Sequence, residues 1–175
     1  MPTLSSGIKV TAFCMAYGLT ASCGQETKSF TYECKDGQKG VIRMERIHDS
    51  LYILHHLIDG VGQSSWELPY PVYRFDCGDL TGDSCPEIAV GVIKATRYSP
   101  TRDKRLFLFK LYRRRLIRPL WLGSRMPHPL EDFRLVGDSV PMRICTSERK
   151  PDGTPCRALY RLGNFGPVFE RYLQE

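Results

Sequence analysis

The stretch GDLTGDSCPEIAVGVI (78–93) joins an acidic loop to a continuous apolar run. Gly82 allows the chain to bend sharply inside the loop, because glycine has no Cβ. The run that begins at Ile88 is short, apolar and preceded by turn residues, which is typical of a buried β-strand. Oxygen-bearing side chains stand at positions 1, 3, 5 and 9 of the loop: Asp79, Thr81, Asp83 and Glu87.

The acidic loop has two readings. Oxygen ligands at this spacing, together with the backbone carbonyl of Cys85, can wrap a hard cation such as Ca²⁺. The same residue types also build a metal-free turn between two strands. Thr81 holds position 3 and Ser84 stands at position 6, where a calcium loop has glycine, so both alternatives stay open.

Short alternating runs separated by turns continue from residue 30 to the end of the chain, with little helical periodicity. Asp36-Gly37 and Asp59-Gly60 are turn dipeptides between such runs. The sequence therefore predicts an all-β, antiparallel fold. The expected strands are 30–35, 39–47, 51–58, 71–79, 87–98, 104–113, 116–123, 132–138, 141–149, 156–163 and 167–173.

An internal repeat is visible in the second half of the chain. When 71–121 is laid on 130–170, Phe75 corresponds to Phe133, and Trp121 to Phe169. The segment 46–66 is a fainter copy that ends in Trp66. Four-stranded units of about 45–55 residues are the size of a propeller blade. We expect two or three blade-like units.

The segment GDLTGDSCPEIAVGV (78–92) resembles the acidic core of an FG-GAP or VCBS-type repeat, the β-propeller blade of integrin α-chains and of many bacterial envelope proteins. It departs from the family pattern at Thr81 and Ser84. The resemblance implies that the carboxylates bind Ca²⁺ or stabilise the turn, and that the unit serves binding rather than catalysis. Because two or three units cannot close a propeller, we expect a partial propeller or a small stacked β domain.

The first residues predict export and lipidation. Lys9 is the only charge in 1–22, and the apolar run 10–21 has the length of a signal-peptide core, too short for a permanent membrane span. Small residues then precede Cys23, as in the lipobox of bacterial lipoproteins, which the segment resembles. We expect a signal peptide (1–22), a tether (23–29) and a β domain (30–175). The mature protein would be held in the bacterial cell envelope, at the outer membrane or periplasmic face, by acylated Cys23.

Five cysteines remain once Cys14 and Cys23 are set aside. No pair has the CxxC spacing of a structural zinc site. In an oxidising compartment, spacing permits two disulfides. Their cysteines are Cys77 with Cys85, which would close the acidic loop, and Cys145 with Cys156.

Eleven basic residues lie between Lys94 and Arg125, opposed only by Asp103. Such a stretch can contact polyanions, lipid headgroups or an acidic partner, or can be a solvated face with an arginine-rich hairpin tip. Export argues against nucleic acid as the partner. The candidate anion-binding residues are Arg102, Lys104, Arg105, Arg113, Arg114, Arg115 and Arg118.

No HExxH, GxSxG, GxGxxG or P-loop motif occurs in the sequence. His55 and His56 are neighbours on one expected strand and therefore face opposite sides. We predict a non-enzymatic envelope lipoprotein that binds an unidentified protein or acidic ligand, with Ca²⁺ as its one candidate cofactor. The alternative is a hydrolase of envelope polymers that uses His128, Glu131 and Asp132.

Overall fold

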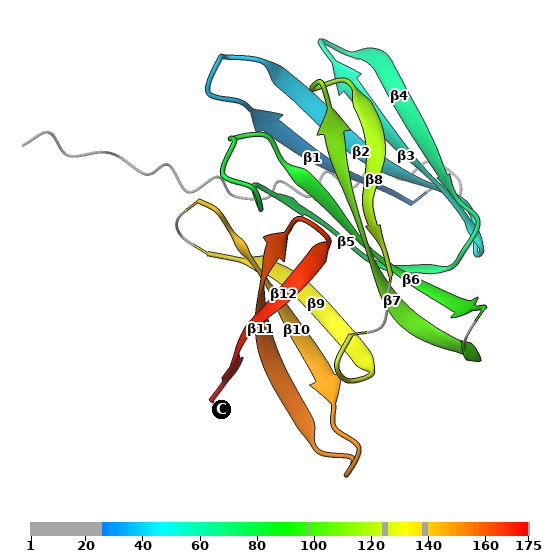
Figure 1. Ribbon diagram of the computed structural model, residues 1–175. Helices are drawn as coiled ribbons and strands as arrows, with labels where there is room; N and C mark the ends of the chain where they lie inside the picture. The colour runs from blue at the N-terminus through cyan, green and yellow to red at the C-terminus, as the bar shows by residue number, and fades with distance from the viewer. Residues whose placement is uncertain (1–25, 98, 124–125, 138–139, 175) are drawn as a thin grey trace, which may run out of the picture.

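The computed structural model describes residues 26–97, 99–123, 126–137 and 140–174. Within these residues the chain forms twelve strands and three four-stranded antiparallel sheets, and no helix. Each sheet is a meander in which consecutive strands are neighbours (Figure 1). The all-β, antiparallel class predicted from the sequence is confirmed.

The first sheet contains β1 (Thr27–Glu33), β2 (Lys39–His48), β3 (Leu51–Ile58) and β4 (Val61–Leu68). The middle sheet contains β5 (Val72–Gly78), β6 (Glu87–Thr96), β7 (Ser99–Tyr112) and β8 (Leu116–Leu122). The third sheet contains β9 (Leu130–Val136), β10 (Arg143–Arg149), β11 (Pro155–Gly163) and β12 (Gly166–Leu173).

The middle sheet is covered on both faces, which explains the continuous apolar run after Glu87. Val90 faces a cluster shared with the first sheet, whereas Ala89 faces a second cluster shared with the third sheet. All six residues from Glu87 to Val92 are buried. A strand with two dry faces cannot alternate between apolar and polar residues, so its sequence reads as one hydrophobic run.

The strand β4 was not among the predicted strands. Its sequence VGQSSWEL contains only Trp66 and Leu68 as large apolar residues after Val61, and Leu68 alone is fully buried. A strand at the edge of a sheet needs little apolar surface, so its sequence signal is weak. By contrast, the predicted bounds 51–58 coincide with β3.

The middle and third sheets are joined along the edge strands β5 and β9. The Asp76 carboxylate accepts a 2.8 Å hydrogen bond from the backbone N–H of Leu135. The backbone N–H of Met142 donates a 2.7 Å hydrogen bond to the carbonyl of Asp79. The acidic loop therefore lies at the junction of two sheets rather than at a free tip.

Candidate functional site

The carboxylates of the acidic loop turn inward, onto the loop's own backbone. Asp79 accepts hydrogen bonds from the N–H groups of Gly82 (2.6 Å) and Ser84 (2.7 Å). Asp83 accepts one from the N–H of Cys85 at 2.8 Å. Gly82 and Ser84 have φ angles of 87° and 71°, in the left-handed region. These hydrogen bonds stabilise a conformation that Ser84 would otherwise disfavour.

The buried side chain of Glu87 binds the first half of the loop. One oxygen of its carboxylate accepts the Leu80 N–H at 2.8 Å, and the other accepts the Thr81 hydroxyl at 3.3 Å. Burial raises the pKa of Glu87 to about 7, and the nearby carboxylates of Asp83 and Asp79 add to the rise. A buried carboxyl group that titrates near neutrality makes this loop sensitive to pH.

The donor set of the loop does not gather around one point. Within the described ranges, no three Cys, His, Asp or Glu side chains form a group able to hold a metal ion. The Glu87 carboxylate binds the backbone N–H of Leu80, while Asp79 and Asp83 bind other backbone N–H groups of the loop. The arrangement works as a turn without a cation, and the calcium site at Asp79, Thr81, Asp83, Cys85 and Glu87 stays a prediction.

The basic stretch does not form one surface. Arg102, Lys104 and Arg105 lie near the start of β7, and Arg113 to Arg118 lie beyond its end. Nine residues of extended strand separate Lys104 from Arg113, about 30 Å. Lys104 donates to the carbonyl of Glu131 at 2.7 Å, and Arg105 pairs with Asp103 at 3.2 Å. Most of the first group is therefore occupied by contacts within the protein.

The β7–β8 tip is fastened to the first sheet. Arg114 forms an ion pair with Asp36, and its carbonyl accepts a hydrogen bond from the Gln38 side chain. The carbonyl of Arg115 accepts a 2.8 Å hydrogen bond from Nδ1 of His56. A carbonyl can only accept, so Nδ1 of His56 carries the proton. In a neutral His56, Nε2 is then unprotonated and accepts a hydrogen bond from the Tyr32 hydroxyl at 2.6 Å. Burial lowers the pKa of His56, which favours this neutral form.

Four cations at this tip face solvent or are half-buried. Lys110 and Arg118 are directly opposite each other on β7 and β8, although both are positive. Arg113 lies over the exposed ring of Tyr112, 5.4 Å from its centroid. Among the described residues, no carboxylate pairs with Lys110, Arg113, Arg115 or Arg118. We refer to Lys110, Tyr112, Arg113, Arg115 and Arg118 as the basic tip.

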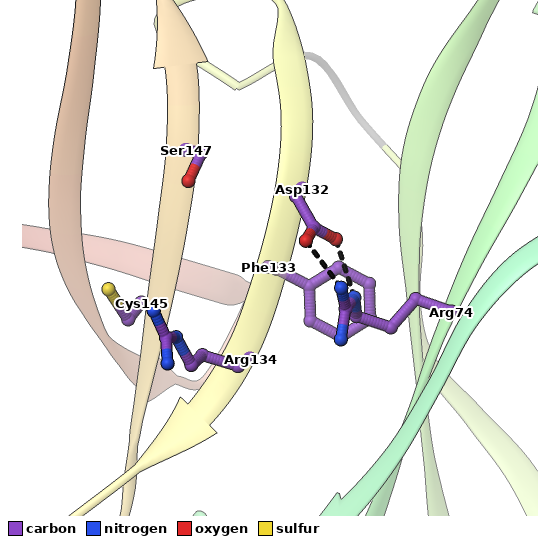
Figure 2. A pocket seen from close by; sticks show the side chains of 6 residues that line it. All are labelled: Arg74, Asp132, Phe133, Arg134, Cys145 and Ser147. Atoms are coloured by element: carbon purple, nitrogen blue, oxygen red, sulfur yellow. Dashed lines mark hydrogen bonds and ion pairs between the residues drawn. The ribbon is translucent and has the colours of Figure 1, made fainter.

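A polar cavity of about 260 Å³ lies at the junction of β5, β9 and β10 (Figure 2). Its sides come from two sheets, since Arg74 on β5 binds both oxygens of the Asp132 carboxylate on β9. The remaining lining residues come from β9 and β10: Phe133, Arg134, Cys145 and Ser147. Sequence reasoning missed this site, apart from naming Asp132 and Cys145 for other roles.

A second cavity, of about 540 Å³, lies near the ends of β8 and β12. Trp121 and Phe169 both line it. The sequence repeat predicts that these two residues are equivalent, but strand register matches Phe169 to Pro119 instead. Its other lining residues are Met126, Pro127, Tyr160 and Pro167. The half-buried Trp121 thus lines a space together with aromatic, methionine and proline side chains.

The three residues of the hydrolase alternative have different partners. His128 is hydrogen-bonded to the Tyr172 hydroxyl at 3.1 Å, and Glu131 pairs with Arg149. Asp132 is occupied by Arg74. Of the three, only Asp132 lines either cavity.

All five cysteines of the β domain are thiols in the structure: Cys34, Cys77, Cys85, Cys145 and Cys156. The disulfides expected from spacing stay predictions. Burial raises the pKa of the Cys85 thiol to about 12, and a hydrogen bond with the Cys34 thiol adds to the rise. Cys34 and Cys85 belong to one buried cluster, so the thiol beside Cys85 comes from the first sheet's β1–β2 turn.

Comparisons with family models, with curated proteins and with solved structures found no match. The resemblance to FG-GAP-type repeats therefore stays a prediction. The expected signal segment 1–22 and Cys23 lie outside the described residues, as does Arg125. None of the described residues forms a helix that is long and apolar enough to cross a membrane.

Proposed function

We propose that this chain is a non-enzymatic binding module of the bacterial cell envelope, anchored through lipidated Cys23, whose basic tip binds an acidic partner. One observation carries the proposal: Lys110 and Arg118 are cross-strand neighbours with like charge. Like charges directly opposite each other destabilise a sheet. An anion supplied from outside the protein relieves this repulsion, so the pair is better suited to binding than to folding.

The surroundings of the pair support a docking role. Arg114 and the Arg115 carbonyl bind residues of the first sheet, and these contacts hold the β7–β8 turn in place. The unpaired cations of the basic tip are therefore presented by an ordered turn. Arg113 and Arg114 have φ angles of 51° and 57°, a backbone conformation that costs energy in residues other than glycine. Tyr112 and Leu116 add exposed apolar area beside the cations. Mixed aromatic and arginine surfaces of this kind favour protein contacts.

The FG-GAP-type resemblance belongs to the same proposal. Three four-stranded meanders with stacked faces are compatible with consecutive propeller blades. In that family the unit serves binding, which agrees with the role proposed for the tip.

Binding of the full chain to poly-L-glutamate tests the tip. We expect Arg118→Glu to abolish binding, and the matched variant Arg102→Glu, at the far end of β7, to retain it. Binding should weaken as salt increases, because the cations are exposed. Equal effects of the two variants would overturn the proposal. Palmitate labelling in a bacterial host, with Cys23→Ser as the control, tests the anchor.

A further inference from the structure

The outer face of the third sheet gathers arginines that are distant in sequence. Phe133, Ile144 and Ala158 face the middle sheet, so the alternate residues of β9, β10 and β11 face outward. On that outer face, Cys145 is opposite Arg134 on β9 and Leu159 on β11. Arg157 is likewise opposite Ser147, and Arg171 is opposite Leu159.

The cavity of Figure 2 is lined in part by residues of this face, namely Arg134, Cys145 and Ser147. Cys145 is only 3% exposed, and Nη2 of Arg157 lies 3.5 Å from its sulfur. Arg134 projects beside Cys145 on the same side of β9. Cys145 and Arg134 therefore line the cavity, whereas Arg157 does not line it and lies beside it through its contact with the Cys145 sulfur.

The charges at the cavity do not cancel. The Asp132 carboxylate is bound by Arg74 through two hydrogen bonds, so it is neutralised locally. Among the described residues, Arg134 and Arg157 have no carboxylate partner, and the Ser147 hydroxyl has no hydrogen-bond partner. One cation without a carboxylate partner, Arg134, and one free hydroxyl, Ser147, line the polar space, and a second cation, Arg157, lies against the lining residue Cys145.

We propose that this cavity binds a phosphate group, held by Arg134, Arg157 and the Ser147 hydroxyl. Guanidinium groups bind oxyanions through paired N–H donors, and each charged hydrogen bond is stronger than a neutral one. Three donors that come from three strands suit the several oxygens of a tetrahedral phosphate better than the two oxygens of a planar carboxylate. The site is separate from the basic tip and does not depend on it.

The phosphate group can belong to a small soluble molecule or to a lipid headgroup, and two arms of one experiment separate these sources. The full chain is melted in neutral detergent with inorganic phosphate, at an ionic strength matched with sodium chloride. In the second arm, phosphatidylglycerol replaces diacylglycerol, which has no phosphate group, in mixed micelles. A ligand that binds only the folded protein raises the melting temperature.

We expect a rise in melting temperature, and a loss of affinity of about tenfold or more in Arg134→Gln/Arg157→Gln, since charged hydrogen bonds are removed. Ser147→Ala should weaken binding less. Both arginines are exposed, so the double variant should fold. Lys110→Gln/Arg118→Gln is the matched control: it disables the basic tip and should leave the phosphate effect intact, so failure of one site is distinguished from failure of the other.

A rise with inorganic phosphate identifies a site for a soluble phosphate group, and a rise only with phosphatidylglycerol identifies a headgroup site. Either result supports the proposal if the Arg134→Gln/Arg157→Gln variant lacks it. No rise in either arm overturns the proposal. A rise that persists unchanged in that variant also overturns it, because the anion would then bind elsewhere.

Discussion

The acidic loop and the basic tip are both dense clusters of charge in the sequence, but the fold uses them in opposite ways. The loop's carboxylates bind the loop's own N–H groups, and Glu87 is buried under it. Within the described part of the chain, no carboxylate pairs with the four cations of the basic tip, and the neighbouring Arg114 pairs with Asp36. A charge cluster that satisfies itself stabilises a turn, whereas one that repels itself is available to a partner.

The largest effect on stability is expected from a disulfide that joins the acidic loop to the first sheet. Oxidation by glutathione disulfide should join Cys34 to Cys85, with two thiol hydrogens transferred to form two glutathione thiols, because these two thiols belong to one buried cluster. Closing a loop of about 50 residues stabilises by about 4 kcal/mol in the chain-entropy model. Non-reducing peptide mapping and melting with and without reductant measure both effects.

Cys77→Ser is the control and should leave this disulfide in place. A bridge between Cys77 and Cys85, which spacing alone suggests, would contradict the expected pairing.

The next effect comes from pH. The folded protein holds a proton on Glu87 up to about pH 7, whereas an unfolded glutamate loses it near its ordinary pKa of 4.5. Between these values the folded state binds more protons, so stability falls as pH rises, by about 3 kcal/mol in total. Below the lower value this dependence ends.

Glu87→Gln keeps an acceptor for the Leu80 N–H and removes the charge. Urea unfolding from pH 4.5 to 8 measures the free energy of unfolding of both proteins. As pH rises, the native chain should lose stability while the variant does not, so the variant gains relative stability toward high pH. A difference that does not change with pH would show that Glu87 does not titrate in this range.

Asp79→Ala should destabilise the protein by about 2 kcal/mol, because two charge-assisted hydrogen bonds to a half-buried turn are lost. The loss should be the same in EDTA and in millimolar calcium if the loop is a metal-free turn. Asp152→Ala is a matched control: Asp152 also accepts a backbone N–H, but in an exposed turn. A rise in melting temperature with calcium that vanishes in Asp79→Ala would instead establish the calcium site.

The smallest change in the free energy of unfolding is expected at the basic tip. It is a stabilisation, opposite in sign to the effect of Asp79→Ala. Arg118→Glu replaces a repulsive cross-strand pair with an attractive one opposite Lys110, which should stabilise by about 0.5 kcal/mol. The same variant should lose the acidic partner. Chemical unfolding and the binding assay, read together, show whether the tip is kept for binding at a cost in stability. A destabilised variant would mean that Arg118 has a structural role.

Most strand positions could be predicted from the sequence, because the alternation of apolar and polar residues and the turn residues are local signals. Leu51–Ile58 was predicted with its observed bounds, since Asp49-Ser50 and Asp59-Gly60 bracket a strongly apolar run. β4 was missed because a peripheral strand buries little and its apolar pattern is weak. The basic stretch was predicted as one candidate region, but its two parts lie near opposite ends of a long strand, a separation that strand length alone could have indicated.

The all-β class and the acidic loop before a buried strand could be predicted from the sequence, because they depend on neighbouring residues and on period-two alternation. The predicted equivalence of Trp121 with Phe169 was wrong, because strand register matches Phe169 to Pro119. The sequence could not show that Cys34 lies beside Cys85, or that Arg134 and Arg157 share one outward face with Ser147. Those contacts depend on strand register and sheet stacking, which bring distant residues together. A shift of one residue would turn every such side chain to the other face.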